Sequence, residues 1–258
     1  MNNTRIKTAF DHGKAFVPCV TAGYPSLEDT HRVVRAAVAA GADAVQVAVP
    51  FSDPTAEGPI MQRACAAALE SGTSTDDVLD LVADLRADVS VPIVLSTYAN
   101  VPFCYGTQQF LNRCREVGVD GLVIPDVPLE ESAEFAPQCE ASGIALIRTV
   151  APTSKNRIEA IASGAPGFIY VMASLGGAGI QADAAQNVEA MVQEVRSHTD
   201  IPCVVGTGIT TPEQAQQLGA LADGIAVGSA LMELVGKTDP EHLEEAVEEY
   251  VTRMKTAL

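Results

Sequence analysis

The chain has no tryptophan, and only 5% of its 258 residues are aromatic. Basic residues are also scarce, with 16 Lys and Arg against 33 Asp and Glu, which gives a formal net charge of −17. A surface of that sign repels the phosphates of nucleic acids and of anionic lipids. We therefore expect a protein that binds neither nucleic acid nor a membrane.

Long apolar runs are missing too, and none approaches the roughly 20 residues that a membrane-spanning helix needs. The first 13 residues are polar and do not have the pattern of a signal peptide. Six cysteines are scattered without a CxxC pair, and no histidine stands close enough to complete a zinc set. These absences predict a soluble, cytoplasmic protein with reduced thiols and no bound metal.

What the sequence does contain is a series of short apolar segments rich in Val and Ile, bounded by Gly, Pro or Asp. Segments that are apolar on both faces are typical of parallel strands covered by helices. We predict strands over 16–21, 44–49, 92–97, 121–125, 144–150, 168–172, 203–206 and 224–227.

Helical patterns alternate with these segments, and several begin near acidic residues and end at a glycine. Eight β–α units in a chain of this length predict one domain, residues 1–258, folded as a (β/α)8 TIM barrel. A doubly wound sheet is the alternative, but it would need fewer strands or a second domain. The predicted helices cover 27–40, 75–87, 107–117, 129–142, 155–163, 184–198 and 212–218.

Glycine-bearing loops follow the last three predicted strands, and in such a barrel the functional groups lie in loops of this kind. The loops contain G-G-A-G (176–179), G-T-G (206–208) and Gly228-Ser229. Glycine lets several backbone N–H groups approach an anion, and a helix predicted over 230–235 would add its amino end. A tight turn explains any one of these loops, but three at neighbouring strand ends favour a phosphate site.

Six motifs stand in order along the chain: F-V-P-C-V-T-A-G-Y-P (16–25), V-P-F-S-D-P-T-A-E-G-P (49–59), G-L-V-I-P-D-V-P (121–128), V-A-P-T-S (150–154), V-V-G-T-G-I-T-T-P (204–212) and A-D-G-I-A-V-G-S-A-L (222–231). In order and spacing they resemble the tryptophan synthase alpha subunit family.

The resemblance implies a (β/α)8 barrel and a phosphate site carried by Gly179, Gly208, Gly228 and Ser229. It also implies retro-aldol cleavage of indole-3-glycerol phosphate to indole and glyceraldehyde 3-phosphate, without a cofactor in this chain. A pyridoxal-phosphate-dependent beta-type subunit is then the implied partner. Tyr98 and Asn100 resemble the family's subunit-contact loop.

The chain departs from the family at the position of its catalytic acid/base. The family has a buried glutamate on the second strand that moves a proton at the indole carbon, and this chain has Gln46 there. An amide forms hydrogen bonds but does not exchange a proton in this way, and losing such a group costs about 10²–10⁴ in rate. Glu57 replaces the loop aspartate that holds the indole N–H, and is our best candidate acid or base.

The end of the pocket that would hold the indole ring also differs. Cys19 and Thr207 replace phenylalanines, and Ser96 and Thr149 replace apolar residues. Hydroxyls and a thiol that stay unpaired against an apolar ring are costly. Three further residues complete the predicted site: Tyr170 and Asp126 are candidates to assist catalysis, and Arg148 is a candidate to bind a second anionic or carbonyl group.

These features leave three hypotheses. The first, which we favour on the sequence, is a diverged lyase that performs aldol or retro-aldol chemistry on another small phosphorylated substrate. The second is an ordinary tryptophan synthase alpha subunit with unusual substitutions. The third is a non-catalytic regulatory partner that binds a phosphorylated ligand.

Overall fold

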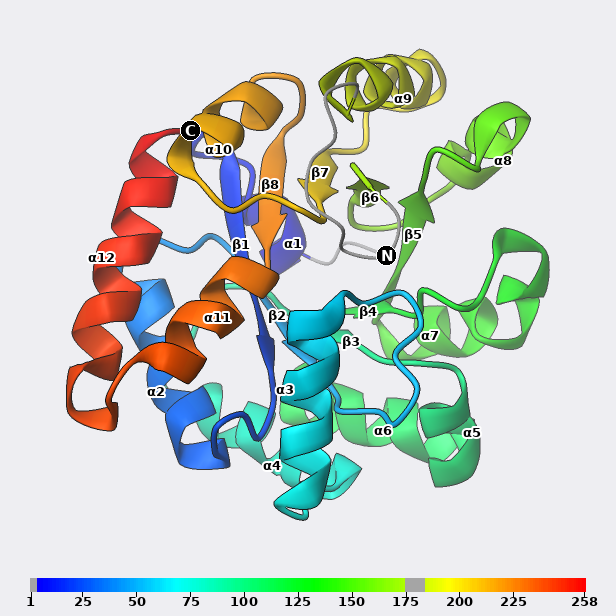
Figure 1. Ribbon diagram of the computed structural model, residues 1–258. Helices are drawn as coiled ribbons and strands as arrows, with labels where there is room; N and C mark the ends of the chain where they lie inside the picture. Colours follow the sequence, from blue (N-terminus) through cyan, green and yellow to red (C-terminus); the bar gives the residue numbers. More distant parts are fainter. Residues whose placement is uncertain (1–3, 175–183) are drawn as a thin grey trace.

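The computed structural model describes residues 4–174 and 184–258 and has the predicted single-domain (β/α)8 TIM barrel (Figure 1). Eight parallel strands close in sequence order, with β8 pairing back to β1. The strands are β1 (Ala15–Thr21), β2 (Val45–Ala48), β3 (Ile93–Ser96), β4 (Gly121–Val123), β5 (Ala145–Val150), β6 (Ile169–Met172), β7 (Cys203–Gly206) and β8 (Gly224–Val227).

Helices surround the barrel and connect successive strands. The larger ones are α2 (Leu27–Ala39), α3 (Pro59–Glu70), α4 (Thr75–Leu85), α6 (Thr107–Val117), α9 (Ala184–His198), α10 (Pro212–Gly219), α11 (Ser229–Lys237) and α12 (Leu243–Thr256). Shorter elements are α1 (Thr4–Thr8), α5 (Asn100–Tyr105), α7 (Ala136–Ser142), α8 (Ile158–Ala162) and the 3₁₀ turns η1 (Leu129–Glu134), η2 (Lys155–Arg157) and η3 (Pro240–His242).

The helix starts follow from local sequence. Ser74 caps α4 by accepting from the Asp77 N–H, while the Asp77 carboxylate accepts from the Ser74 N–H, which forms a complete capping box. Thr211 and Gln214 form the same arrangement at the start of α10. Such caps satisfy backbone donors that have no partner inside the helix, so they fix where the helix begins.

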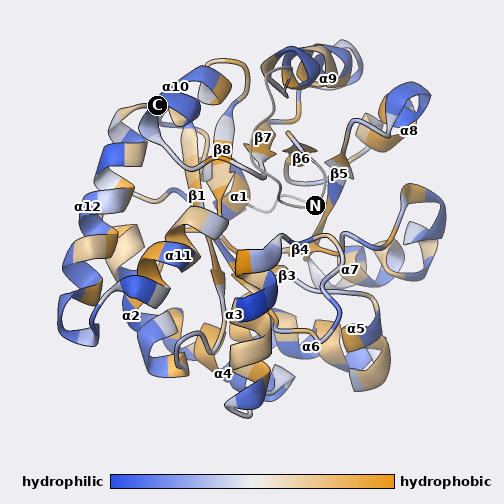
Figure 2. Ribbon diagram, viewed as in Figure 1, coloured by the Kyte–Doolittle hydropathy of each residue, from blue (hydrophilic) through white to orange (hydrophobic). Residues whose placement is uncertain are grey.

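Two hydrophobic layers hold the barrel together. The outer layer lies between the strands and the helices, and Figure 2 shows the matching pattern of apolar strands and two-faced helices. The inner layer fills the barrel with side chains such as Val17, Val94, Ile147 and Val204. Ile6, on α1, joins this inner layer and is 2% exposed. The barrel interior is therefore packed rather than open.

The C-terminal helix α12 packs against the amino-terminal part of the barrel. In Figure 1 the C-terminal helix α12 lies beside α2. Near the end of α12, the Lys255 ammonium donates to the Asp43 carboxylate at 2.6 Å and to the Lys14 carbonyl at 2.7 Å. The same carboxylate accepts from the Phe16 N–H at 2.7 Å, so one cluster ties α12 to the amino end of β1.

Candidate active site

A cavity of about 80 Å³ lies at the carboxyl end of the barrel. All eight strands, or the residues directly after them, contribute to its wall. Its lining residues are Cys19, Gln46, Ala56, Glu57, Gly58, Met61, Ser96, Val123, Pro125, Thr149, Tyr170, Met172, Thr207, Gly208, Ile209, Ala226, Gly228 and Ser229. Most of the residues that the sequence indicated for the site therefore meet in one place.

Gln46 points into the barrel from β2, where it pairs in register with Cys19 of β1 and Val94 of β3. Its side chain is largely buried, with 8% of the residue exposed. The amide oxygen Oε1 is fully buried and has no hydrogen-bond partner within residues 4–174 and 184–258. A buried acceptor of this kind costs roughly 1–3 kcal/mol unless a donor reaches it, so it is ready for a ligand.

Glu57 enters the cavity from the loop after β2. Its backbone is held on both sides: its N–H donates to the Pro54 carbonyl at 2.9 Å, and its carbonyl accepts from Gln62 Nε2 at 2.8 Å. Among the residues that the structure describes, its carboxylate has no hydrogen-bond partner. Burial raises the pKa of this carboxyl above its ordinary value, so its protonated form persists to higher pH.

Tyr170 and Cys19 lie on the inner face of the barrel beside this carboxyl. Burial raises the pKa of the Tyr170 phenol and of the Cys19 thiol, and the nearby Glu57 raises both further. Both groups are therefore neutral at ordinary pH. Gly206 makes room for the phenol, because a Cβ at this position would lie 2.1 Å from Tyr170 Oη.

The β7 and β8 end of the cavity is built from backbone and hydroxyl groups. Thr207 has a left-handed φ of 71°, and its hydroxyl accepts from the Ser174 N–H at 3.1 Å. Gly208 follows with φ 84°. Gly228 and Ser229 line the cavity where α11 begins, so the amino end of this helix faces the space. Such an end favours an anion.

Two predicted site residues, Arg148 and Asp126, line an adjoining hollow of about 370 Å³ that shares part of its wall with this cavity. Arg148 Nη1 donates to the carbonyls of Ile161 at 2.9 Å and Ser163 at 2.8 Å, and so braces the end of α8. Asp126 is exposed, and its carboxylate accepts from the Ala99 N–H at 3.1 and 3.2 Å. Neither residue lines the smaller cavity, and their roles toward a ligand stay predictions.

Gly179, assigned to the phosphate site from the sequence, lies outside the described residues. Several apolar lining residues were not predicted from the sequence. Met61 comes from α3, which we did not predict, and Val123, Met172 and Ala226 come from predicted strands. Strand alternation could have identified the last three, because side chains two residues apart share a face.

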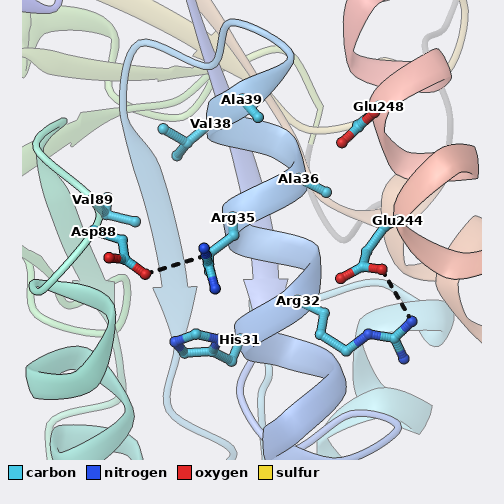
Figure 3. A pocket seen from close by; sticks show the side chains of 10 residues that line it. All are labelled: His31, Arg32, Arg35, Ala36, Val38, Ala39, Asp88, Val89, Glu244 and Glu248. Atoms are coloured by element: carbon cyan, nitrogen blue, oxygen red, sulfur yellow. Dashed lines mark hydrogen bonds and ion pairs between the residues drawn. The ribbon is translucent and has the colours of Figure 1, made fainter.

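A larger hollow, of about 510 Å³, lies outside the barrel between α2, α12 and the segment after α4 (Figure 3). Size alone would favour it over the barrel cavity. Both arginines that line it already form ion pairs, however: Arg35 with Asp88 at 3.4 Å, and Arg32 with Glu244 at 3.3 Å. These ion pairs brace neighbouring elements, and we assign no site there.

Residues 4–174 and 184–258 contain no group of three or more His, Cys, Asp or Glu side chains placed to hold a metal ion. Within the same ranges, no helix has the length and apolar character needed to cross a bilayer.

The fold and the site together define a barrel protein with a polar cavity at the carboxyl ends of its strands, the usual place for catalysis in this fold. Residues 7–258 match the family model described as tryptophan synthase alpha chain. The chain belongs to this family, whose members are carbon–carbon lyases. The family assignment supports an enzyme over a non-catalytic regulatory partner.

Relatives and solved structures agree with this assignment. The tryptophan synthase alpha chain of Lacticaseibacillus casei is 40% identical over 255 residues, covering 99% of this chain and 96% of the relative. The alpha chain structure from Legionella pneumophila is 30% identical, with a TM-score of 0.86 over 98% of this chain and 96% of that one. A tryptophan synthase structure from Mycobacterium tuberculosis is 29% identical, with a TM-score of 0.90 over 98% and 97%.

Proposed function

We propose that the chain cleaves indole-3-glycerol phosphate to indole and glyceraldehyde 3-phosphate. The observation that carries this proposal is the carboxyl group of Glu57, which lines the cavity and has no hydrogen-bond partner among the described residues. The curated relatives, which match almost the whole chain and are described as tryptophan synthase alpha chains, favour this substrate over the diverged substrate that the sequence first suggested.

The reaction breaks the bond between the indole ring carbon and the neighbouring side-chain carbon. The ring carbon gains a proton, and the hydroxyl on the side-chain carbon loses one as it becomes an aldehyde. A protonated carboxyl has two oxygens, so Glu57 can donate its proton to the ring carbon while its other oxygen accepts the hydroxyl proton. The raised pKa of Glu57 favours the protonated starting form.

Other cavity residues bind and orient the substrate in this proposal. The start of α11, with Gly228 and Ser229, and the backbone at Gly208 hold the phosphate. Gln46 accepts a hydrogen bond from the substrate through its unpartnered Oε1. The Tyr170 phenol, neutral because burial raises its pKa, donates to a substrate oxygen.

Indole release from indole-3-glycerol phosphate tests the proposal. The Gln46→Glu substitution restores the acid/base that the family uses, so we expect it to raise kcat by about 10²–10⁴. Glu57→Gln should lower the kcat of the unmodified chain by a similar factor. Indole release that is unaffected by Glu57→Gln would contradict the assigned role.

A second candidate is a lyase for another phosphorylated substrate with a more polar remainder. The specific observation that favours it is the polar wall of the cavity, where Cys19, Ser96, Thr149 and Thr207 stand beside the unpartnered amide oxygen of Gln46. Failure of both the unmodified chain and Gln46→Glu to release indole, together with calorimetric binding of a sugar phosphate, would favour this candidate.

We also infer a pyridoxal-phosphate-dependent beta-type partner, in keeping with the cytoplasmic location expected for both. Among the described residues, Phe103 and Leu69 are the exposed large apolar side chains, at 49% and 37%. Phe103 lies on α5, directly after the loop that resembles the family's subunit contact. Phe103→Asp should therefore weaken association with a beta subunit at least about tenfold in size-exclusion or calorimetric titration, a cost of about 1.4 kcal/mol.

Leu69→Asp, on α3, is the matched control and should leave association unchanged. Equal effects of the two substitutions, or an effect of neither, would contradict this placement of the partner.

A further inference from the structure

Tyr98 is buried in the loop after β3, two residues beyond its end, is 6% exposed, and does not line the cavity. Its ring stacks on Phe51, at the start of the loop after β2, with centroids 5.3 Å apart and planes inclined by 22°. Its hydroxyl oxygen accepts from the Ala56 N–H at 3.0 Å. The same side chain therefore contacts both ends of the loop that carries Glu57.

The Ala56 bond adjoins the carboxyl-bearing residue, because Ala56 directly precedes Glu57. Adjacent Cα atoms are about 3.8 Å apart, so a displacement of the Ala56 peptide moves the Glu57 side chain with it. The backbone of Glu57 makes two other contacts: one with Pro54 of the same loop, and one with Gln62 of α3. Of these contacts, only the Tyr98 bond ties this part of the loop to a neighbouring strand end.

Tyr98 is itself held from the next strand. The Asp126 carboxylate, after β4, accepts from the N–H of Ala99, which directly follows Tyr98. The loops after β4, β3 and β2 are thus linked in series, and the last link ends beside the cavity carboxyl. Asp126 therefore supports the Glu57 loop through Tyr98, although it does not line the cavity.

We propose that Tyr98 is a positioning residue for Glu57: through the Ala56 N–H, its hydroxyl sets how deeply the carboxyl enters the cavity. The inference rests on the proposed function, which makes Glu57 the proton-transferring group. It predicts that removing the Tyr98 hydroxyl changes the environment of Glu57 without removing any group that touches the substrate.

The electrostatic surroundings make the pKa of Glu57 a usable readout. Within the described part of the chain, the titratable groups that interact with it are Cys19 on β1, Cys65 on α3, Tyr98 and Tyr170. Burial raises the pKa of each, so all four are neutral near pH 7 and none adds a charge beside Glu57. Its pKa is therefore set mainly by how far it is removed from water.

The test compares Tyr98→Phe with Tyr105→Phe. The control also loses one phenol hydroxyl, which donates to Asp76 at 2.5 Å, but it lies on α5 away from the Glu57 loop. The first measurement is the pKa of Glu57 by carbon-13 NMR of the labelled carboxyl, with Glu57→Gln to assign the signal. We expect Tyr98→Phe to move this pKa toward that of a free glutamate, and Tyr105→Phe to leave it in place.

The second measurement is indole release. Tyr98→Phe should lower kcat roughly tenfold to a hundredfold, as small misplacements of a catalytic group do, with KM unchanged because the phosphate end is untouched. Its pH–rate profile should shift with the pKa of Glu57. An unchanged Glu57 pKa, or a kcat and melting temperature that change no more than in Tyr105→Phe, would overturn the proposal.

The two proposals can fail separately. If the unmodified chain releases no indole, the proposed function fails; if Glu57→Gln leaves turnover unchanged, the catalytic role of Glu57 fails. In both cases the NMR titration still decides whether Tyr98 positions the carboxyl. If Glu57→Gln abolishes turnover while Tyr98→Phe matches its control, only the positioning role is wrong.

Discussion

In the proposed mechanism, Gln46 and Glu57 each have one of the two properties, an inward buried place and a titrating group, that the family resemblance assigns to a single glutamate. Gln46 has the inward, buried place on β2 but does not titrate. Glu57 titrates but reaches the cavity from a loop. Because the position of a loop residue depends on contacts with neighbouring elements, the hydrogen bond from the Ala56 N–H to the Tyr98 hydroxyl helps to set where the Glu57 carboxyl lies.

The raised pKa of Glu57 has a consequence for stability. Folding places the carboxylate where it is poorly hydrated, so its folded pKa exceeds the unfolded value of about 4.3. Between these two values the folded state binds more protons, and stability falls as the pH rises through them. We expect Glu57→Gln to be more stable than the unmodified chain near pH 7, although it loses activity by about 10²–10⁴.

Chemical denaturation of both proteins across pH 4–8 measures this effect. The difference in unfolding free energy should be smallest at the acid end and grow in favour of Glu57→Gln as the pH rises. A constant difference, or one of opposite sign, would show that the carboxyl is not desolvated in the folded chain.

Side-chain direction explains which residues could be predicted from the sequence. Thr149 and Arg148 are neighbours on β5, and only Thr149 points into the cavity because successive side chains of a strand alternate. The sequence indicated that both residues lie near the site, but it did not show which of the two side chains points into the cavity. Asp126 shows the same limit, since a residue after a strand end can serve a neighbouring loop instead of the cavity.

At the scale of elements, the strands were predictable to within one or two residues, because both of their faces are buried and apolar. The helices were less so. The predicted helix over 129–142 is divided into η1 and α7, where Pro137 lies in the first turn of α7 and supplies no N–H to continue the preceding turn. α3 was missed because its start, Gly58-Pro59, lies inside the motif that we interpreted as a catalytic loop.

One buried cluster joins several elements at the amino end of the barrel. Arg86, just after α4, donates to the carbonyls of Gly118 at 2.9 Å and Val91 at 2.7 Å and pairs with Asp120, which is 4% exposed. Asp120 also accepts from the Ile93 N–H at 2.9 Å, so the cluster connects β3 and β4.

Arg86→Met should therefore lower the free energy of unfolding by about 3 kcal/mol, because it leaves a buried carboxylate with weaker compensation. Arg113→Met is the control: its pair with Asp80 at 2.7 Å is largely exposed and is worth at most about 1 kcal/mol. Urea denaturation of the two variants measures both costs. Equal losses would mean that the Arg86 cluster contributes no more than a surface pair.

For the whole molecule, the barrel, the glycine-bearing strand ends and the family could be inferred from sequence motifs, and the substrate could not. The motifs specify backbone geometry at β7 and β8, where we propose that the phosphate binds, and this geometry does not distinguish one phosphorylated ligand from another. The polar wall at Cys19, Ser96 and Thr149 led us to favour a different substrate, whereas whole-length similarity to tryptophan synthase alpha chains favours indole-3-glycerol phosphate. Single substitutions change a cavity without changing the fold that the similarity reports.

The pH dependence of kcat/KM for indole release by the unmodified chain tests the central claim most directly. With Glu57 as the one acid that transfers the proton, the rate should fall through a single ionisation above the ordinary glutamate pKa of about 4.3, since the protonated form is active. Gln46→Glu should add a second ionisation. A profile that shows no such ionisation, or a rate that rises through it, would contradict the account.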